Sequence, residues 1–402
     1  MTKQANGQGS IFLWPNGRYC VKVIVRGEAV RRFAKTRTEA QRLLRELNAG
    51  KINGQILVGR SPTVAAYMNA WIDERDPLLP QAGVAKLAYA TIGGYRRRAA
   101  HLLATIGDVQ LRNLEPAEIR RALAAISAKG LSSTTVSDCR VFLATVLKSA
   151  MRERPPKVAF NAAELVDHIK RDDTEKYALD ETEANRFLAA AKAHGRLYSA
   201  LLVAVHLGPR AGELWGARWS AIDWNKGTLH ISSSLYWIGA GANTARTFAM
   251  KPPKTEHGDR VIRLSKAALA ALKAHHDTEA HRLGKVPHRD AFIWTDEKGG
   301  PVDHRNVLRD VFYPICKAAE IPFVGAHDCV DPEHGRCPAF LTFHGLRHSA
   351  ATLALAATKD VLAVSRMLGH ASTEFTMDVY GHVLEKQQRE IADYMDAAVV
   401  GR

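Results

Sequence analysis

The stretch Thr342-Phe-His-Gly-Leu-Arg-His348 decides how the C-terminal part of this chain folds. It predicts a helix, and a spacing of three residues puts His344 and Arg347 on one helical face. The chain then carries Leu368-Gly-His370 and Val379-Tyr-Gly-His382. A histidine, an arginine, a second histidine and a tyrosine thus follow in fixed order, and this order favours a site that holds a phosphate group.

Two segments upstream supply further charged groups. Gly208-Pro-Arg-Ala-Gly-Glu213 contains Arg210, and Glu213 follows three residues later, where it can hold the arginine in place. Farther on, Pro253-Lys-Thr255 places Lys254 in a polar turn. The sequence therefore offers a second arginine and a lysine for the same site.

Cleavage of a phosphodiester without water or metal needs an in-line nucleophile, cations on the non-bridging oxygens, a base and an acid. Arg210 and Arg347 suit the clamp, because guanidinium groups match phosphate oxygens bidentately and stay charged. His344 suits the general base. Tyr380 suits the nucleophile, and its ordinary pKa of about 10 means that it needs a base and nearby positive charge to ionise.

The two remaining residues complete the set. Lys254 is expected as the general acid that protonates the leaving oxygen, and His370 as a hydrogen-bond donor to a phosphate oxygen. Each residue alone is more typical of an ordinary surface or core position. Their coincidence in one order is what favours the cutting and rejoining of DNA strands.

The chain resembles the tyrosine recombinases of the phage integrase family. The matching blocks are 207–214, 253–255 with 260–264, 342–352 and 368–382. The resemblance implies that Tyr380 is the nucleophile and that five residues surround the phosphate: Arg210, Lys254, His344, Arg347 and His370. It also implies a 3′-phosphotyrosine intermediate that needs neither ATP, Mg²⁺ nor another cofactor, and four protomers that join two DNA sites through a Holliday junction.

The predicted fold is multidomain, mainly α with small β elements. Residues 1–60 are expected to form an arm-type DNA-binding domain with its linker, in which three strands precede a helix capped by Thr38. Residues 61–156 predict an all-helical, SAM-like core-binding domain, followed by a linker over 157–176. Residues 177–402 predict a mixed α+β catalytic domain of tyrosine recombinase type, with strands over 228–237 and 260–264. Its final helix, 385–399, is interpreted as docking onto a neighbouring protomer or as packing on its own domain.

The net charge of +15 favours a polyanionic partner, double-stranded DNA with core and arm sites. The first 60 residues hold four lysines and eight arginines against three glutamates. Their three strands are expected to lie in a DNA groove. Three adjacent arginines on a later helix are interpreted as phosphate contacts or as a solvated face. The predicted DNA contacts are Arg18, Arg31, Arg32, Lys35, Arg96, Arg97 and Arg98.

An insertion just before the catalytic helix contains two cysteines and two histidines. It is interpreted as a loop with free thiols, although the spacing His-x-Cys…His-x-x-Cys would also suit one tetrahedral zinc ion. The ligands would be His327, Cys329, His334 and Cys337. The odd total of five cysteines does not suggest a disulfide framework.

The expected function is site-specific recombination that integrates or excises a phage or mobile element. Two alternatives are a DNA-binding or excision-control protein without catalysis, and a type IB topoisomerase. The intact set of six residues argues against the first, and the patterned basic segment 9–49 against the second. No long apolar run or signal-peptide core is present, so a cytoplasmic protein of a bacterial cell is expected, acting on DNA without membrane contact. DNA-bending accessory proteins are further candidate partners.

Overall fold

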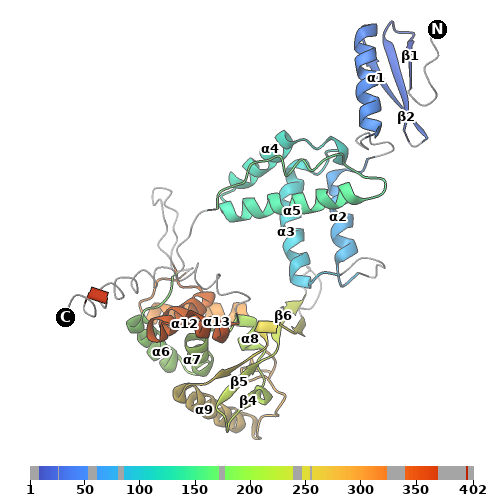
Figure 1. Ribbon diagram of the computed structural model, residues 1–402. Helices are drawn as coiled ribbons and strands as arrows, with labels where there is room; N and C mark the ends of the chain where they lie inside the picture. Colours follow the sequence, from blue (N-terminus) through green and yellow to red (C-terminus); the bar gives the residue numbers. More distant parts are fainter. Residues whose placement is uncertain are drawn as a thin grey trace. The chain divides into compact units, whose positions relative to one another are not determined.

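The computed structural model describes residues 9–25, 27–52, 61–79, 86–171, 177–238, 247–253, 256–323, 340–369 and 395–396. The chain divides into two compact units, Met1–Asp173 and Thr174–Arg402. Figure 1 shows the elements of both. The first unit contains β1 (Ser10–Leu13), β2 (Tyr19–Val25), β3 (Glu28–Ala34), α1 (Arg37–Ile52), α2 (Val64–Arg75), α3 (Tyr89–Ile106), the 3₁₀ turn η1 (Leu111–Asn113), α4 (Pro116–Ser127) and α5 (Ser133–Arg152).

The second unit contains helices of 4 to 18 residues and two small sheets. Its helices are α6 (Glu181–His194), α7 (Tyr198–Leu207), α8 (Ala211–Trp215), α9 (Lys266–Leu283), α10 (His304–Val307), the π-helical η4 (Leu308–Phe312), α11 (Tyr313–Ala318), α12 (Phe343–Thr358) and α13 (Val361–Leu368). Its strands and 3₁₀ turns are η2 (Trp219–Ala221), β4 (Ile222–Asp223), β5 (Thr228–Ile231), β6 (Ser234–Ile238), β7 (Thr247–Lys251), η3 (Glu256–Gly258) and β8 (Arg260–Arg263).

The strands β1, β2 and β3 form an antiparallel sheet, and α1 packs along one of its faces (Figure 1). Successive side chains of a strand point to opposite faces. Val21, Val23 and Val25 of β2 therefore share the face toward α1, where they are buried with Ala40 and Leu44. The predicted three-stranded sheet with one helix is confirmed.

The start of α1 differs from the prediction. The Thr36 hydroxyl accepts a hydrogen bond from the Glu39 N–H at 3.2 Å, and α1 begins at Arg37. The predicted cap at Thr38 was wrong, because Thr38 already lies inside the first turn.

The helices α2 to α5 surround a second hydrophobic core, as the all-helical prediction required. Tyr95 and Phe142 stack with ring centroids 4.8 Å apart, and Trp71 packs against both rings. A buried aromatic cluster of this kind contributes strongly to the packing energy. This core is separate from the one beneath α1.

The segment after α5 belongs to the helical core. Val158 and Val166 are buried in it, and Arg140 Nε donates to the Val166 carbonyl oxygen at 2.8 Å. The first part of the predicted linker, 157–176, therefore packs against the helices. The boundary between the two units lies near its other end, after Asp173.

The second unit is organised around a buried aromatic group. The rings of Phe312 and Phe343 lie 5.5 Å apart, as do those of Trp215 and Phe343. The helices α6, α7, α11 and α12 meet around this core, and the antiparallel sheet β4-β5-β8 packs on α9 (Figure 1). No helix in the described part of the chain is both long and apolar enough to cross a membrane.

The strand pattern corrects one prediction. The predicted single strand over 228–237 is two strands, since β5 pairs with β4 and β8 while β6 pairs with β7. Ser232 and Ser233 separate them and let the chain change sheets. The strand β7 was not predicted, because its Thr-Phe-Ala-Met-Lys sequence has no clear alternation.

Candidate active site and nucleic-acid interface

The end of α7 lies tightly against α12 and α13. Gly208 ends α7 with a φ of 60°, a conformation that favours glycine. A Cβ there would lie 2.7 Å from Leu368 Cδ2 and 3.1 Å from Ala350 Cβ. Because only glycine allows this approach, the chain can bring Arg210, two residues later, beside both helices.

Arg347 is held inside this junction. Arg347 is only 4% exposed. Its Nη1 donates to the Gly208 carbonyl oxygen at 2.7 Å, and its Nη2 donates to the Leu368 carbonyl oxygen at 2.8 Å. The ends of α7 and α13 thus fix the plane of the guanidinium. A predicted clamp residue therefore sits in a defined orientation before any DNA binds.

Arg210 stands at the start of the short helix α8. Glu213 accepts from the Arg210 backbone N–H at 2.9 Å and from its Nη1 at 2.8 Å. The Arg210 side chain is 45% exposed, whereas that of Glu213 is 6% exposed. The predicted contact between the two residues is present, and it leaves part of the guanidinium facing solvent.

A third arginine joins the site, and it was not predicted. Arg260, at the start of β8, donates from Nη2 to Glu213 at 2.9 Å and from Nε to the Met367 carbonyl oxygen at 2.8 Å. The strand alternates buried and exposed positions, with Arg260 and Ile262 inside. That alternation was the available signal, because it puts Arg260 on the core side of the strand.

The three arginines converge on one turn of the chain. The Met367 carbonyl accepts a hydrogen bond from Arg260, and the Leu368 carbonyl accepts one from Arg347. The Gly369 carbonyl accepts one from Arg210 at 3.4 Å. The C-terminal end of a helix exposes unpaired carbonyls and the negative end of its dipole, so cations are stabilised there. We call Arg210, Arg260 and Arg347 the arginine cluster. It surrounds the residues that directly precede His370.

Glu213 is the buried counter-charge of this cluster. Burial by itself raises the pKa of a carboxyl, but Arg260 and then Arg210 outweigh it, so the pKa of Glu213 is lowered. The carboxylate stays ionised at neutral pH. One negative charge among three guanidinium groups leaves an excess of positive charge, as a phosphate site requires.

His344 lies one helical turn before Arg347 on α12. The helix is capped by the Thr342 hydroxyl, which accepts from the Gly345 N–H at 3.0 Å. His344 is exposed, whereas Arg347 is buried. The ring centroid of His344 lies 5.0 Å from that of His348. The predicted base is thus at the surface of the site.

The other predicted site residues lie outside the described part of the chain. These are Lys254, His370 and Tyr380, together with His327, Cys329, His334 and Cys337 of the predicted zinc alternative. The predicted docking helix, 385–399, is described only at Met395 and Asp396. Among the described residues, no group of three or more metal-ligating side chains could hold a metal ion.

The N-terminal sheet carries a basic outer face, opposite α1. Lys22 of β2 lies directly across from Arg31 of β3 on this face. Arg32 pairs with Val21 and therefore points to the other face. Like charges placed opposite each other are unfavourable unless an anion lies between them. Lys22 was not among the predicted DNA contacts, and the strand register places it on the outer face beside Arg31.

Arg18 and Lys35 flank this sheet. Arg18 follows the turn before β2, where its backbone N–H donates to Asn16 Oδ1 at 3.2 Å. Lys35 precedes α1, and its backbone N–H donates to Glu39 at 2.9 Å. Both side chains are exposed.

The arginines of α3 differ from one another. Arg96 donates to Asp73 at 2.8 Å and to Asp76 at 2.9 Å, and Arg98 pairs with Asp138 at 2.7 Å. Arg97 is exposed, and no ion pair joins it to another described residue. Within the predicted set of three, Arg97 is therefore the residue best placed to meet a phosphate.

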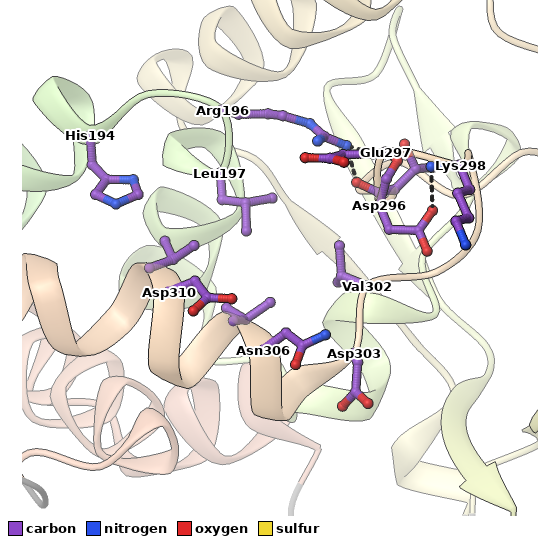
Figure 2. A pocket seen from close by; sticks show the side chains of 13 residues that line it. His194, Arg196, Leu197, Asp296, Glu297, Lys298, Val302, Asp303, Asn306 and Asp310 are labelled. Atoms are coloured by element: carbon purple, nitrogen blue, oxygen red, sulfur yellow. Dashed lines mark hydrogen bonds between the residues drawn. The ribbon is translucent and has the colours of Figure 1, made fainter. Parts of the chain in front are cut away.

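A pocket of about 480 Å³ lies elsewhere in the second unit (Figure 2). Arg196 and Leu197 line it just before α7, with Asp303 and Asp310 on the opposite side. The helix α7 has 10 residues and so is about 15 Å long. The pocket lies at the N-terminal end of α7, whereas Arg210 follows the C-terminal end. The pocket is therefore not part of the arginine cluster.

Comparison with known proteins agrees with this fold. The chain is 23% identical over 385 residues to the tyrosine recombinase XerC-like protein of Caldanaerobacter subterraneus subsp. tengcongensis, covering 92% of both chains. The Tn1549 transposon integrase in complex with a circular intermediate DNA aligns with a TM-score of 0.63 and 18% identity, covering 82% of this chain and 100% of that one.

A second solved structure covers the chain more widely. The lambda integrase tetramer bound to a Holliday junction aligns with a TM-score of 0.54 and 17% identity, over 94% of this chain and 96% of that one. The sequence profile described as "Phage integrase family" matches residues 177–387, just over half of the chain. Because this match spans α6 to α13 and the whole arginine cluster, the chain belongs to the phage integrase family and is a site-specific recombinase of the tyrosine type.

Proposed function

We propose that this recombinase cuts and rejoins DNA through a covalent bond between Tyr380 and a 3′ phosphate, and that it thereby integrates or excises a phage or mobile element. One observation carries the proposal. Arg210 and Arg347, which are far apart in sequence, both donate to the turn that precedes His370. Two guanidinium groups at one site are what a phosphodiester under attack requires.

The proposed reaction has two transesterification steps. The Tyr380 oxygen loses its proton to His344, attacks phosphorus and forms a phosphotyrosine, while the 5′ oxygen leaves and takes a proton from Lys254. Arg210, Arg347 and His370 hold the non-bridging oxygens. In the second step the 5′ hydroxyl of a partner strand gives its proton to Lys254 and attacks phosphorus, while the tyrosine oxygen leaves and takes back the proton held by His344. Each step exchanges one phosphate ester for another, so the bond energy is conserved and no nucleotide is consumed.

The proposed partners follow the units of the chain. Residues 1–60 are proposed to bind arm sites through the basic outer face, and the helical part of the first unit to bind the core site through Arg97. The solved lambda integrase complex is a tetramer on a Holliday junction. A tetramer of this chain on two DNA sites is proposed by analogy, as is action on DNA in the bacterial cytoplasm.

A suicide substrate tests the catalytic proposal. The purified full chain is incubated with a nicked duplex that carries its candidate core site, with EDTA present, and covalent adducts are resolved on a denaturing gel. We expect a slowly migrating DNA–protein band that Tyr380→Phe abolishes. A bound, correct core site without any adduct would overturn the proposal in favour of a DNA-binding role.

A second assay separates recombinase from topoisomerase. Supercoiled plasmids with and without the core site are incubated with the protein. A site-specific recombinase acts only on the plasmid that carries the site. Equal relaxation of both plasmids would contradict site specificity.

A further inference from the structure

We propose that Arg260 is a positioning residue of this recombinase: it orients Arg210 through Glu213 and holds the turn before His370 through the Met367 carbonyl. This inference rests on the proposed function of that site. It adds a residue that supports the reaction without touching DNA.

The contacts of Arg260 join three segments of the site. Nη2 donates to Glu213 at 2.9 Å, Nε to the Met367 carbonyl at 2.8 Å, and Nη1 to the Gly258 carbonyl at 3.1 Å. Gly258 ends the turn that follows Lys254 in the sequence, and Met367 lies three residues before His370. One side chain thus connects α8, the end of α13 and the turn η3.

Burial separates this role from catalysis. The Arg260 side chain is 7% exposed, whereas that of Arg210 is 45% exposed. Each of its three guanidinium nitrogens already donates to the protein. Arg210 is therefore the arginine of the pair that can contact a phosphate, and Arg260 acts on it indirectly, through Glu213.

Packing at Gly369 gives an independent reason. This residue has a φ of 70°, and a Cβ there would lie 2.9 Å from Arg260 Nη1 and 3.0 Å from its Cδ. The stem of Arg260 thus lies directly against the turn from which His370 continues. Removing the side chain would open a space beside that turn and let it shift.

The charges around Glu213 predict how the rate of a variant at Arg260 should depend on pH. Glu213 faces Arg210 on α8, Arg260 on β8 and, across a small pocket of about 190 Å³, Arg218 and His230. His230 is itself bonded to Asp259 at 2.7 Å. Among these groups Arg260 does most to lower the pKa of Glu213 against the effect of burial. Without Arg260 the pKa of Glu213 should rise, and the acid form cannot hold Arg210 by charge.

The test compares Arg260→Met and Arg260→Lys with the unaltered full chain. Arg263→Met is the matched control, since it removes an exposed arginine from the same strand. Adduct formation on the suicide substrate is timed between about pH 5.5 and 8.5, and DNA binding and thermal unfolding are measured alongside. Glu213→Gln, alone and combined with Arg260→Met, shows whether Arg260 acts through the carboxylate.

Arg260→Met should slow adduct formation on the order of 10- to 100-fold, because small misplacements of reacting groups have effects of this size. The loss should deepen toward low pH, DNA binding should stay near normal, and Arg260→Lys should recover part of the rate. In the Glu213→Gln background the extra pH dependence should vanish. Arg263→Met should resemble the unaltered protein.

Several results would overturn the inference. One is a folded Arg260→Met with an unaltered rate and pH profile. Another is a uniform loss of rate, DNA binding and thermal stability in both Arg260 variants, which indicates structural damage alone. If the unaltered protein forms no adduct, the proposed function fails first, so the two failures are distinguishable.

Discussion

Arg347 and Gly208 are joined by a hydrogen bond of 2.7 Å, although 139 positions of sequence separate them. The carbonyl at the end of α7 accepts from a guanidinium on α12, and the left-handed conformation of Gly208 directs that carbonyl. The contact ties the helix before Arg210 to the helix that carries His344. It makes the backbone at Gly208 part of the site.

Gly208→Ala should destabilise the second unit more than the same change at Gly284. Both glycines end helices with φ near 60°, at 60° and 64°, so both lose about 1–2 kcal/mol to left-handed strain. A methyl group at Gly208 also meets Leu368 and Ala350, whereas nothing lies within 4 Å at Gly284. Overpacking of this kind costs about 1–3 kcal/mol more. Urea unfolding of both variants measures the difference, and equal losses would contradict the packing argument.

Glu213→Gln should destabilise the second unit by about 3–5 kcal/mol at neutral pH, because it leaves the buried Arg260 without its counter-charge. The pKa of Glu213 is below its usual 4.5 in the folded chain. The carboxylate therefore stabilises the fold above about pH 4.5, and this stability is lost as pH falls through the folded pKa. Between pH 7 and pH 3 the free energy of unfolding should change less with pH in the variant than in the unaltered protein. A parallel pH dependence in both proteins would show that Glu213 is not the titrating group.

Stability should also decrease as pH falls below about 6.5, because burial lowers the pKa of His206, His275 and His304. The unfolded chain binds protons at these sites before the folded chain does, so acid favours unfolding in this range. His304 Nδ1 accepts from Trp215 Nε1 at 3.2 Å, which requires the neutral ring. His304→Gln should reduce the slope of melting temperature between pH 7 and pH 5.5. An unaltered slope would exclude His304 as a contributor.

Arg97→Ala should affect DNA binding, whereas Arg96→Ala should affect stability. Arg97 is exposed, so its removal should weaken core-site binding and lower the salt slope of the affinity by about 1 without altering stability. Arg96→Ala should destabilise the helical part of the first unit by about 1–3 kcal/mol, because it removes a partner of the nearly buried Asp76. Salt-dependent binding and urea unfolding of both variants decide this. Equal salt slopes for the two would contradict the assignment.

Lys22→Ala and Arg31→Ala should each weaken arm-site binding, because the two side chains lie across from each other on the outer face. Each should lower the salt slope by about 1. Arg42→Ala is the matched control, since it removes an exposed cation from α1. Titrations of arm-site DNA at two salt concentrations measure the effect. A loss with Arg42→Ala as large as with Lys22→Ala would point to general charge rather than to the outer face.

Local patterns were sufficient for much of the chain. The three strands and one helix of residues 1–60 and the all-helical fold of the segment that follows were predicted, because apolar spacing and turn residues act within a few positions. The two β-structures of 228–238 were merged in prediction because both are apolar and β-branched or aromatic. Which sheet each strand joins depends on partners elsewhere in the chain, so periodicity could not separate them.

The sequence by itself determined the family and the chemical types of the site residues, since Arg210, Glu213, His344 and Arg347 stand in short, specific motifs. Only the tertiary structure decided that Arg260 completes the arginine cluster and that Lys22 faces Arg31. It also decided that Arg96 and Arg98 pair with carboxylates, whereas Arg97 forms no ion pair with a described residue. The reason is physical. A side chain's type is local, but the groups that share its hydrogen bonds and screen its charge come from distant segments that only folding brings together.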